Sequence, residues 1–281
     1  MSKELSNDEV KEIESVAKKL RRHIVRMIHN AKSGHPGGSL SAIDVLTVLY
    51  TKVMRHFPDW DKNPNFADRD RFVLSKGHAS AAIYSILAHC GYFPEEDLLE
   101  YRKFGTKLQG HPCCSKLKGI EVSTGSLGQG LSIACGMALG IKLDKKNSRV
   151  YVLMGDGELQ EGSVWEALMH IAHRKLDNIV VVIDKNNLQI DGSTDEIKSL
   201  GNLEAKLEAF GFDVMNVDGH DIEALIKTFE KTKKQTGPVA VIAQTVKGKG
   251  VSFMENTTAW HGKAPNKEEY DLAIGEIDAD R

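Results

Sequence analysis

The segment Tyr151-Val-Leu-Met-Gly-Asp-Gly-Glu-Leu-Gln-Glu-Gly162 joins an apolar run to a glycine-rich turn. So short an apolar run is typical of a buried strand, and helical spacing over residues 164–173 predicts a helix after the turn. Glycines let the backbone approach a phosphate, and a helix N-terminus favours negative charge. Asp156 stands where the strand ends, and its carboxylate is a hard oxygen ligand for Mg²⁺ or Ca²⁺. The segment therefore predicts a metal-bridged phosphate site at a strand end.

A second apolar run, residues 179–183, is followed by the loop Asp184-Lys-Asn-Asn-Leu-Gln-Ile-Asp-Gly192. Ligands gather at the carboxyl ends of parallel strands, so we expect this loop to lie beside Asp156. An asparagine side chain and a backbone carbonyl would complete the ligands of the cation, and we assign these positions to Asn186 and Leu188. Either loop alone is more often an ordinary turn. Both together, at strand ends, favour a cation that bridges a diphosphate to the protein.

The rest of the chain predicts an α/β fold. Helical spacing marks residues 10–28, capped by Asn7 or Asp8, and then residues 42–54, 79–89, 131–142, 203–210 and 222–232. Short apolar runs stand at residues 72–74, 150–154, 214–217 and 239–243. This alternation predicts a doubly wound parallel sheet with helices on both faces. No repeat or linker divides the sequence, so residues 1–281 are expected to form a single domain.

Composition excludes several classes of function. Hydrophobic residues make up 41% of the chain, charged residues 27%, and the net charge is -2, as in an ordinary globular protein. That balance argues against binding to nucleic acid or to a membrane surface. The sequence shows neither a signal peptide nor a long apolar run, and its four cysteines lack CxxC spacing. We therefore expect a cytoplasmic protein with reduced thiols.

Gly155-Asp156-Gly157 followed by Asn186-Asn187 resembles the signature of thiamine-diphosphate enzymes. Five further segments narrow the resemblance to transketolases: Ser33-Gly-His-Pro-Gly-Gly38, Leu74-Ser-Lys-Gly-His-Ala79, Gly110-His-Pro112, Thr124-Gly-Ser-Leu-Gly-Gln-Gly130 and His261-Gly262. All occur in the family's order and span nearly the whole chain. The resemblance implies the diphosphate-binding domain of this family, with thiamine diphosphate and Mg²⁺ or Ca²⁺ as cofactors.

The resemblance also implies roles for single residues. These are catalytic roles for His35, His111, His261 and Glu161, cofactor binding by His78, Gly125, Leu127, Gly155, Gly157, Asn186, Ile190 and His261, and metal binding by Asp156, Asn186 and Leu188. His35 and His111 would hold the first hydroxyl and carbonyl oxygens of the donor sugar. The Gly125 carbonyl would accept the cofactor's amino group, while Leu127 and Ile190 keep the cofactor bent. Imidazoles suit a polyhydroxylated substrate because they donate, accept and shuttle protons.

Other polar residues are expected to be structural, solvated or inert. They are His220, in a capping or structural role, His23, His29, His170 and His173 on helices, Lys76, Lys247 and Lys249 as solvated charges, and Cys113 and Cys114 as spectators.

The family's reaction also needs a carboxylate against the cofactor's pyrimidine ring. In full-length relatives that glutamate belongs to a second domain, and none follows the His261 segment before Arg281. Glu161 resembles a carboxylate that faces the interface with this domain and does not replace the missing one. The sequence thus predicts a partner subunit that carries the pyrimidine-binding and C-terminal domains, in an assembly of two copies of each chain. Ser39-Leu40 after Gly38, where single-chain transketolases usually have Ala-Pro, also resembles separately encoded N-terminal subunits.

The function expected from the resemblance is transfer of a two-carbon ketol unit from a ketose phosphate to an aldose phosphate. A subunit of 1-deoxyxylulose-phosphate synthase or of a 2-oxo-acid dehydrogenase is an alternative that shares the two metal-loop motifs. A non-catalytic cofactor-binding subunit is another, although neither Asp156 nor the loop histidines are lost. The preferred sugars, the native cation and the identity of the partner stay open at this point.

Overall fold

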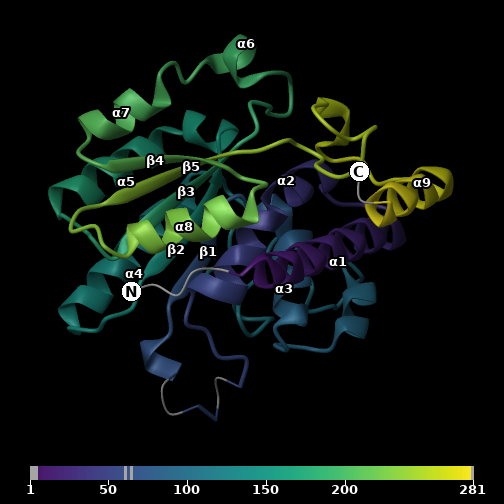
Figure 1. Ribbon diagram of the computed structural model, residues 1–281, viewed down its shortest axis with the longest axis horizontal. Helices are drawn as coiled ribbons and strands as arrows, with labels where there is room; N and C mark the ends of the chain where they lie inside the picture. The colour runs from purple at the N-terminus through teal and green to yellow at the C-terminus, as the bar shows by residue number, and fades with distance from the viewer. Residues whose placement is uncertain (1–5, 60–61, 64–65, 280–281) are drawn as a thin grey trace.

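A computed structural model describes residues 6–59, 62–63 and 66–279, and its described part is built on one five-stranded parallel sheet (Figure 1). The strands are β1 (Arg71–Leu74), β2 (Val150–Gly155), β3 (Ile179–Lys185), β4 (Asp213–Asp218) and β5 (Val239–Gln244), in the order β1-β2-β3-β5-β4. The register pairs Gly155 at the end of β2 with Asp184 at the end of β3. The parallel sheet predicted from the sequence is confirmed.

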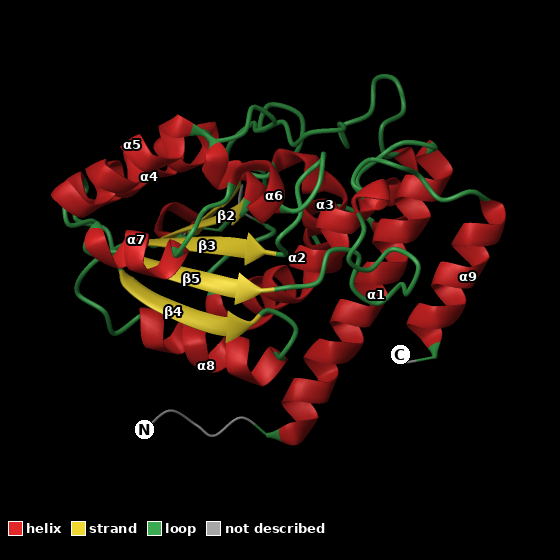
Figure 2. Ribbon diagram, turned by 90° about the horizontal axis from the view of Figure 1, so that it is seen from above, coloured by secondary structure: helices red, strands yellow, loops and turns green. Residues whose placement is uncertain are grey.

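Helices cover both faces of the sheet (Figure 2). One face packs against α4 (Gln129–Leu143), α5 (Gly162–His173) and α7 (Leu203–Ala209). The other packs against α1 (Asn7–Ala31), α2 (Pro36–Val48), α3 (Ser80–His89) and α8 (Ile222–Thr232), and α9 (Lys267–Asp278) lies against α1. Since successive strand residues alternate between faces, Val152 contributes to the first core and Leu153 to the second. Each fully buried aliphatic side chain of this kind contributes about 1.5–3 kcal/mol.

The connection from β4 to β5 explains why α8 lies opposite α5 and α7. The chain advances from β2 to β3 and on to β4 at the sheet edge, and then returns to place β5 between β3 and β4. Right-handed crossovers put the helix of a returning connection on the opposite face. The fold is therefore doubly wound, as predicted.

Two helix starts differ from the prediction. The first helix is capped by Ser6 in a capping box with Glu9, not by Asn7 or Asp8. The second begins at Pro36 instead of residue 42, because proline suits the first helical position, and it passes into a π-helical turn, Leu49–Val53. The glycines after Pro36 are thus helical, and His35 is the N-cap residue that enters the helix.

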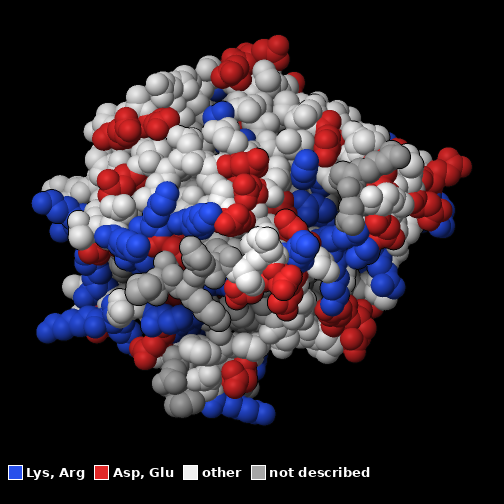
Figure 3. Space-filling view, viewed as in Figure 1, with Lys and Arg blue, Asp and Glu red and all other residues white. Residues whose placement is uncertain are grey.

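Short helical segments complete the described structure. They are the 3₁₀ turns Phe66–Asp68, Gly77–Ala79, Glu95–Glu100, Gly157–Gln160 and Thr258–Trp260, and the small helix α6, Thr194–Lys198. None of the helices in the described part combines the length and apolar character of a membrane span. On the face shown in Figure 3, acidic and basic side chains are intermixed.

Candidate active site

The two loops predicted to bind a metal, residues 155–162 and 184–192 and called the metal loops below, lie side by side at the carboxyl ends of β2 and β3. The Asp156 amide donates to the Asp184 carbonyl at 3.2 Å. The Asp156 carboxylate accepts the amide of Gly157 at 2.9 Å and the amide of Asn187 at 2.5 Å, so that residues of both loops converge on it. The Asn186 side-chain oxygen accepts the Leu188 amide at 3.2 Å. Burial, and then the nearby Asp184 charge, raise the pKa of Asp156 to about 6.

A cavity of about 350 Å³ opens at these loops, a size typical of small-ligand sites. The predicted residues that line it are His35, His78, Gly125, Leu127, Gly155, Asp156, Gly157, Glu161, Asn186, Leu188, Ile190 and His261. Of the predicted set only His111 is not part of the lining, although its ring lies 6.4 Å from that of His35. Ile190 is 62% exposed, and Glu161 is exposed at the start of α5. The structure thus brings segments from the whole chain to one site.

Three imidazoles line the cavity, those of His35, His78 and His261, and the ring of His111 lies near that of His35. The His35 ring lies 5.4 Å from His78 and 5.6 Å from His261, and the rings of His78 and His261 stack at 5.2 Å. Burial, helped by the neighbouring positive charges, lowers the pKa of His35 to about 4 and that of His261 to about 3. The pKa values of His78 and His111 are also lowered, mainly by burial. All four rings are therefore neutral at neutral pH in the ligand-free chain.

The expectation that Lys76 and Lys247 carry solvated charges is wrong. Both are only 2% exposed and both line the cavity. Lys247 donates to the Leu188 carbonyl at 3.3 Å and lies 3.0 Å from His261 Nδ1, and no carboxylate in the described part of the chain forms an ion pair with it. Burial, and then the Lys76 charge, lower the pKa of Lys247 to about 8. Lys249 is partly exposed and lies 4.0 Å from Glu255, as expected of a solvated charge.

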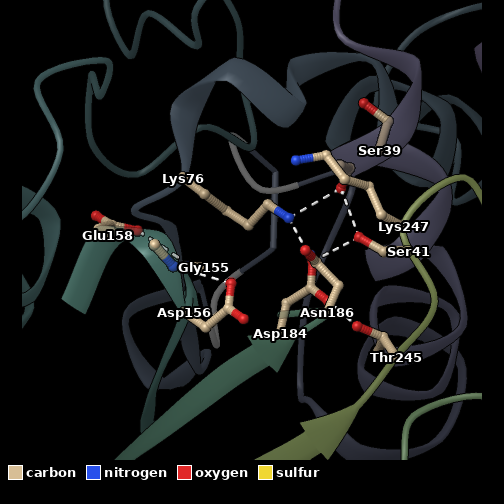
Figure 4. A network of polar contacts seen from close by, with 12 residues as sticks. Ser39, Ser41, Lys76, Gly155, Asp156, Glu158, Asp184, Asn186, Thr245 and Lys247 are labelled. Atoms are coloured by element: carbon tan, nitrogen blue, oxygen red, sulfur yellow. Dashed lines mark hydrogen bonds and ion pairs between the residues drawn. The ribbon is translucent and has the colours of Figure 1, made fainter. Parts of the chain in front are cut away.

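Lys76 belongs to a buried polar network centred on Asp184, which is 0% exposed (Figure 4). The Lys76 ammonium donates to the Asp184 carboxylate and, at 2.9 Å, to the Gly38 carbonyl. Asp184 also accepts the hydroxyls of Ser41, at 2.6 Å, and of Thr245. Because these groups come from α2 and from the ends of β1, β3 and β5, the network fixes the floor of the cavity.

Glu158 is a buried carboxylate that the sequence does not distinguish from its charged neighbours. It accepts the Ser75 hydroxyl and the amides of Gly128, at 2.9 Å, and Gly155, at 3.2 Å. Burial raises the pKa of this carboxyl group. Glu158 thereby ties the loop that precedes α4 to the metal loop.

His220 has the structural role expected of it. Its Nδ1 lies 2.7 Å from Asp44, its Nε2 accepts the Val246 amide at 2.8 Å, and Asp44 forms a bidentate ion pair with Arg21. These side chains line a separate cavity of about 350 Å³, where they are already paired with one another. The four cysteines are unpaired.

A doubly wound sheet with carboxylate and amide oxygens and a buried lysine at its strand ends has the features of an α/β domain that binds an anionic ligand. The chain belongs to the transketolase family: the family model described as "Transketolase, thiamine diphosphate binding domain" matches residues 13–275.

Relatives place the similarity along nearly the whole chain. The chain is 44% identical over 272 residues to an apulose-4-phosphate transketolase subunit of Phocaeicola vulgatus, covering 96% of this chain and 95% of that one. It is 40% identical over 268 residues to a 6-deoxy-6-sulfo-D-fructose transketolase subunit of a Clostridium species, covering 95% and 96%. The crystal structure of transketolase from Campylobacter jejuni superposes with a TM-score of 0.89 at 37% identity. That match covers 96% of this chain and 43% of the Campylobacter chain, so this chain spans less than half of the solved enzyme.

Proposed function

We propose that this chain is the diphosphate-binding subunit of a transketolase that transfers a two-carbon ketol unit from a ketose phosphate to an aldose phosphate. The observation that carries the proposal is the cavity at the strand ends, where the metal loops, three imidazoles and the buried Lys247 ammonium meet. A site with hard oxygen ligands and unbalanced positive charge suits a phosphorylated ligand.

The residues present fit the diphosphate of thiamine diphosphate. Asp156, Asn186 and the Leu188 carbonyl offer three oxygens for Mg²⁺ or Ca²⁺, and Lys247 offers a cation without a carboxylate partner among the described residues. A β-carbon added at Gly155 would point into open space beside the site, so the glycine leaves that space to a ligand. No cluster of three His, Cys, Asp or Glu side chains in the described residues could hold a metal alone. The remaining ligands of the cation would accordingly come from the diphosphate.

Bound thiamine diphosphate would supply a nucleophilic carbon for the carbonyl group of the donor sugar. Around it, we assign His35 and His111 to the first hydroxyl and carbonyl oxygens of the donor, and His261 to reacting oxygens and the diphosphate. His78 would face the diphosphate, and the Gly125 carbonyl would accept the cofactor's amino group. These assignments rest on the family motifs and, for every residue except His111, on a position in the cavity lining.

Leu127 and Ile190 would pack against the apolar side of the cofactor. Both line the cavity, and the exposure of Ile190 leaves an apolar side chain free for this contact.

We further propose that activity requires a separate subunit with the pyrimidine-binding domain, in an assembly of two copies of each chain in the cytoplasm. Relatives that match this chain over nearly their full length are named as subunits. Glu161 lies exposed at the rim of the cavity, where a partner carboxylate can approach it. On the outer side of α4, Ile133 is exposed and β-carbons added at Gly136 and Gly140 would meet nothing, so this face can accept a closely packed helix.

The test is ketol transfer by the purified chain with thiamine diphosphate and Mg²⁺, before and after addition of the candidate partner. Donors should include apulose 4-phosphate, 6-deoxy-6-sulfo-D-fructose and ordinary ketose phosphates, and pyruvate separates the 1-deoxyxylulose-phosphate synthase alternative. We expect activity only in the reconstituted enzyme and only with a ketose donor. Full activity of the chain alone, or turnover of pyruvate instead of ketoses, would refute the proposal.

A further inference from the structure

Arg102, whose side chain contacts His35, has an unusual backbone conformation. Its φ is +60°, a left-handed value that costs a non-glycine residue about 1 kcal/mol or more unless the surroundings enforce it. The guanidinium donates to the Ser33 hydroxyl at 2.8 Å, to the Gly110 carbonyl at 3.3 Å and to the Tyr101 hydroxyl at 3.2 Å, and its Nη2 lies 3.4 Å from His35 Nδ1. One side chain thus joins the segments around Ser33, Tyr101 and Gly110 next to His35, which lines the cavity.

These contacts decide where His35 carries its proton. A guanidinium has N–H donors and no acceptor, and it stays protonated throughout the accessible pH range. His35 Nδ1 must therefore accept, which leaves the ring proton on Nε2. That edge of the ring points toward the opposite loop, since His35 Nε2 lies 3.7 Å from the position of a β-carbon at Gly262. His35, which lines the cavity, consequently carries its N–H group on the ring edge that faces the His261-Gly262 segment.

Resting on the proposed function, we propose that Arg102 is a positioning residue that fixes His35 as the neutral Nε2–H tautomer and holds the backbone next to His111. His35 then donates a hydrogen bond to a substrate oxygen instead of removing a proton from it. Arg102 acts through the two histidines.

The charge of Arg102 supports this assignment. No carboxylate in the described residues forms an ion pair with it, so its full field acts on the neighbouring imidazoles. After burial, Arg102 is the largest cause of the lowered pKa of His35, and it also lowers the pKa of His111. The other titratable groups that face His35 are its histidine neighbours and Lys247: His78, His111 and His261. Each of these is neutral or positive, so none is an anion that would attract the imidazole proton to Nδ1.

A parallel contact exists at His261. There Lys247 lies 3.0 Å from Nδ1, so that ring also carries its proton on Nε2 when neutral. Two cations, Arg102 and Lys247, thus set the tautomers of two imidazole donors.

The first experiment reads the tautomer directly and needs no activity. In the chain labelled with ¹⁵N-histidine, long-range ¹H–¹⁵N spectra distinguish protonated from bare ring nitrogens, and a His35→Gln variant assigns the signal. We expect His35 of the unmodified chain to be protonated on Nε2 alone. Arg102→Met should give a mixture of tautomers, whereas Lys103→Met, which removes an exposed neighbouring cation, should change nothing.

The second experiment uses the reconstituted enzyme. Arg102→Met should lower kcat about 10²-fold through misplacement of His35 and His111, while the affinity for thiamine diphosphate changes less than about twofold. It should also move the acid limb of the kcat profile to higher pH, because the histidine pKa values rise when the arginine charge is lost.

A His35 protonated on Nδ1 in the unmodified chain would overturn the proposal, even if Arg102→Met does not fold. So would an unchanged tautomer in Arg102→Met accompanied by a raised KM, which would show direct substrate binding by Arg102. If the unmodified reconstituted enzyme transfers no ketol group, the proposed function fails, and the tautomer result is still decided by the spectra.

Discussion

The buried ion pair of Lys76 and Asp184 gives a sharp test of how the cavity floor is held together. Both side chains are almost completely shielded from solvent, and the pair joins residues 108 positions apart in the sequence. Removing one member of such a pair leaves an uncompensated buried charge and costs about 3–5 kcal/mol. We therefore expect Lys76→Met and Asp184→Asn each to lower the free energy of unfolding by about that amount, a large fraction of the roughly 5–15 kcal/mol typical of a domain.

The double variant should be no less stable than either single variant. Asparagine keeps acceptor and donor groups for the hydroxyls of Ser41 and Thr245, and methionine fills the path of the lysine side chain without a charge. The coupling energy of the cycle is then at least about 2 kcal/mol. An exposed pair, Lys142 and Asp177 at 2.7 Å, is the matched control, and its removal should cost less than about 1 kcal/mol.

The assay is urea unfolding followed by circular dichroism and tryptophan fluorescence, at two protein concentrations so that self-association is recognised. Single variants that cost less than about 1 kcal/mol, or costs that simply add in the double variant, would show that Lys76 and Asp184 do not act as a pair. A wild-type-like cofactor affinity in both single variants would likewise contradict the network's role as the cavity floor.

Three further predictions concern other parts of the site and core. In the metal-free chain the folded pKa of Asp156, about 6, exceeds its ordinary value of 3.8, so the free energy of unfolding should fall as the pH rises from about 4 to 6. Asp156→Asn should remove this pH dependence in urea titrations. Asp156→Ala should abolish chelator-sensitive binding of thiamine diphosphate in calorimetry. The buried Tyr151 hydroxyl has no hydrogen-bond partner among the described residues, so Tyr151→Phe should be neutral or stabilising in thermal unfolding, whereas Tyr84→Phe loses a 2.9 Å bond and should cost about 1 kcal/mol. In the reconstituted enzyme, His261→Ala should lower turnover about 10²–10⁴-fold with little loss of cofactor affinity. His220→Ala should lower stability and leave turnover nearly unchanged. Equal losses of turnover would contradict the assignment of His261 to the reaction and of His220 to the structure.

The sequence predicts the sheet and the metal loops because short local sequence patterns are enough to identify them. Fully apolar runs have few alternatives to buried parallel strands, and the turns that follow supply Asp156 and Asn186 at strand ends. Helical spacing misplaces the start of α2 because Gly37 and Gly38 have low helix propensity, whereas Pro36 at the first helical position is the informative signal. Helix α9 is absent from the predicted elements, although Asn266 and Glu269 form a capping box that the sequence displays.

The burial of the charged residues at the cavity floor cannot be predicted from the sequence, for a different reason. Whether a lysine is solvated or buried depends on what lies opposite, and the partners of Lys76 and Lys247 come from distant segments. Glu158 differs from its exposed neighbour Glu161 only through contacts with Ser75 and two backbone amides. Residue type alone carries no signal for such contacts.

The pKa values of His35 and His261 indicate that burial and positive neighbours keep both rings neutral, and that an anionic ligand would oppose the effect of these neighbours. Near neutral pH, pKa values of about 4 for His35 and about 3 for His261 leave both rings neutral, and the positive neighbours that help to depress them are Arg102 and Lys247. A diphosphate beside Lys247 would offset part of this positive charge and raise both pKa values. Binding of an anionic ligand is therefore expected to raise the pKa values of His35 and His261, while the contacts of their Nδ1 atoms with Arg102 and Lys247 keep the ring proton on Nε2.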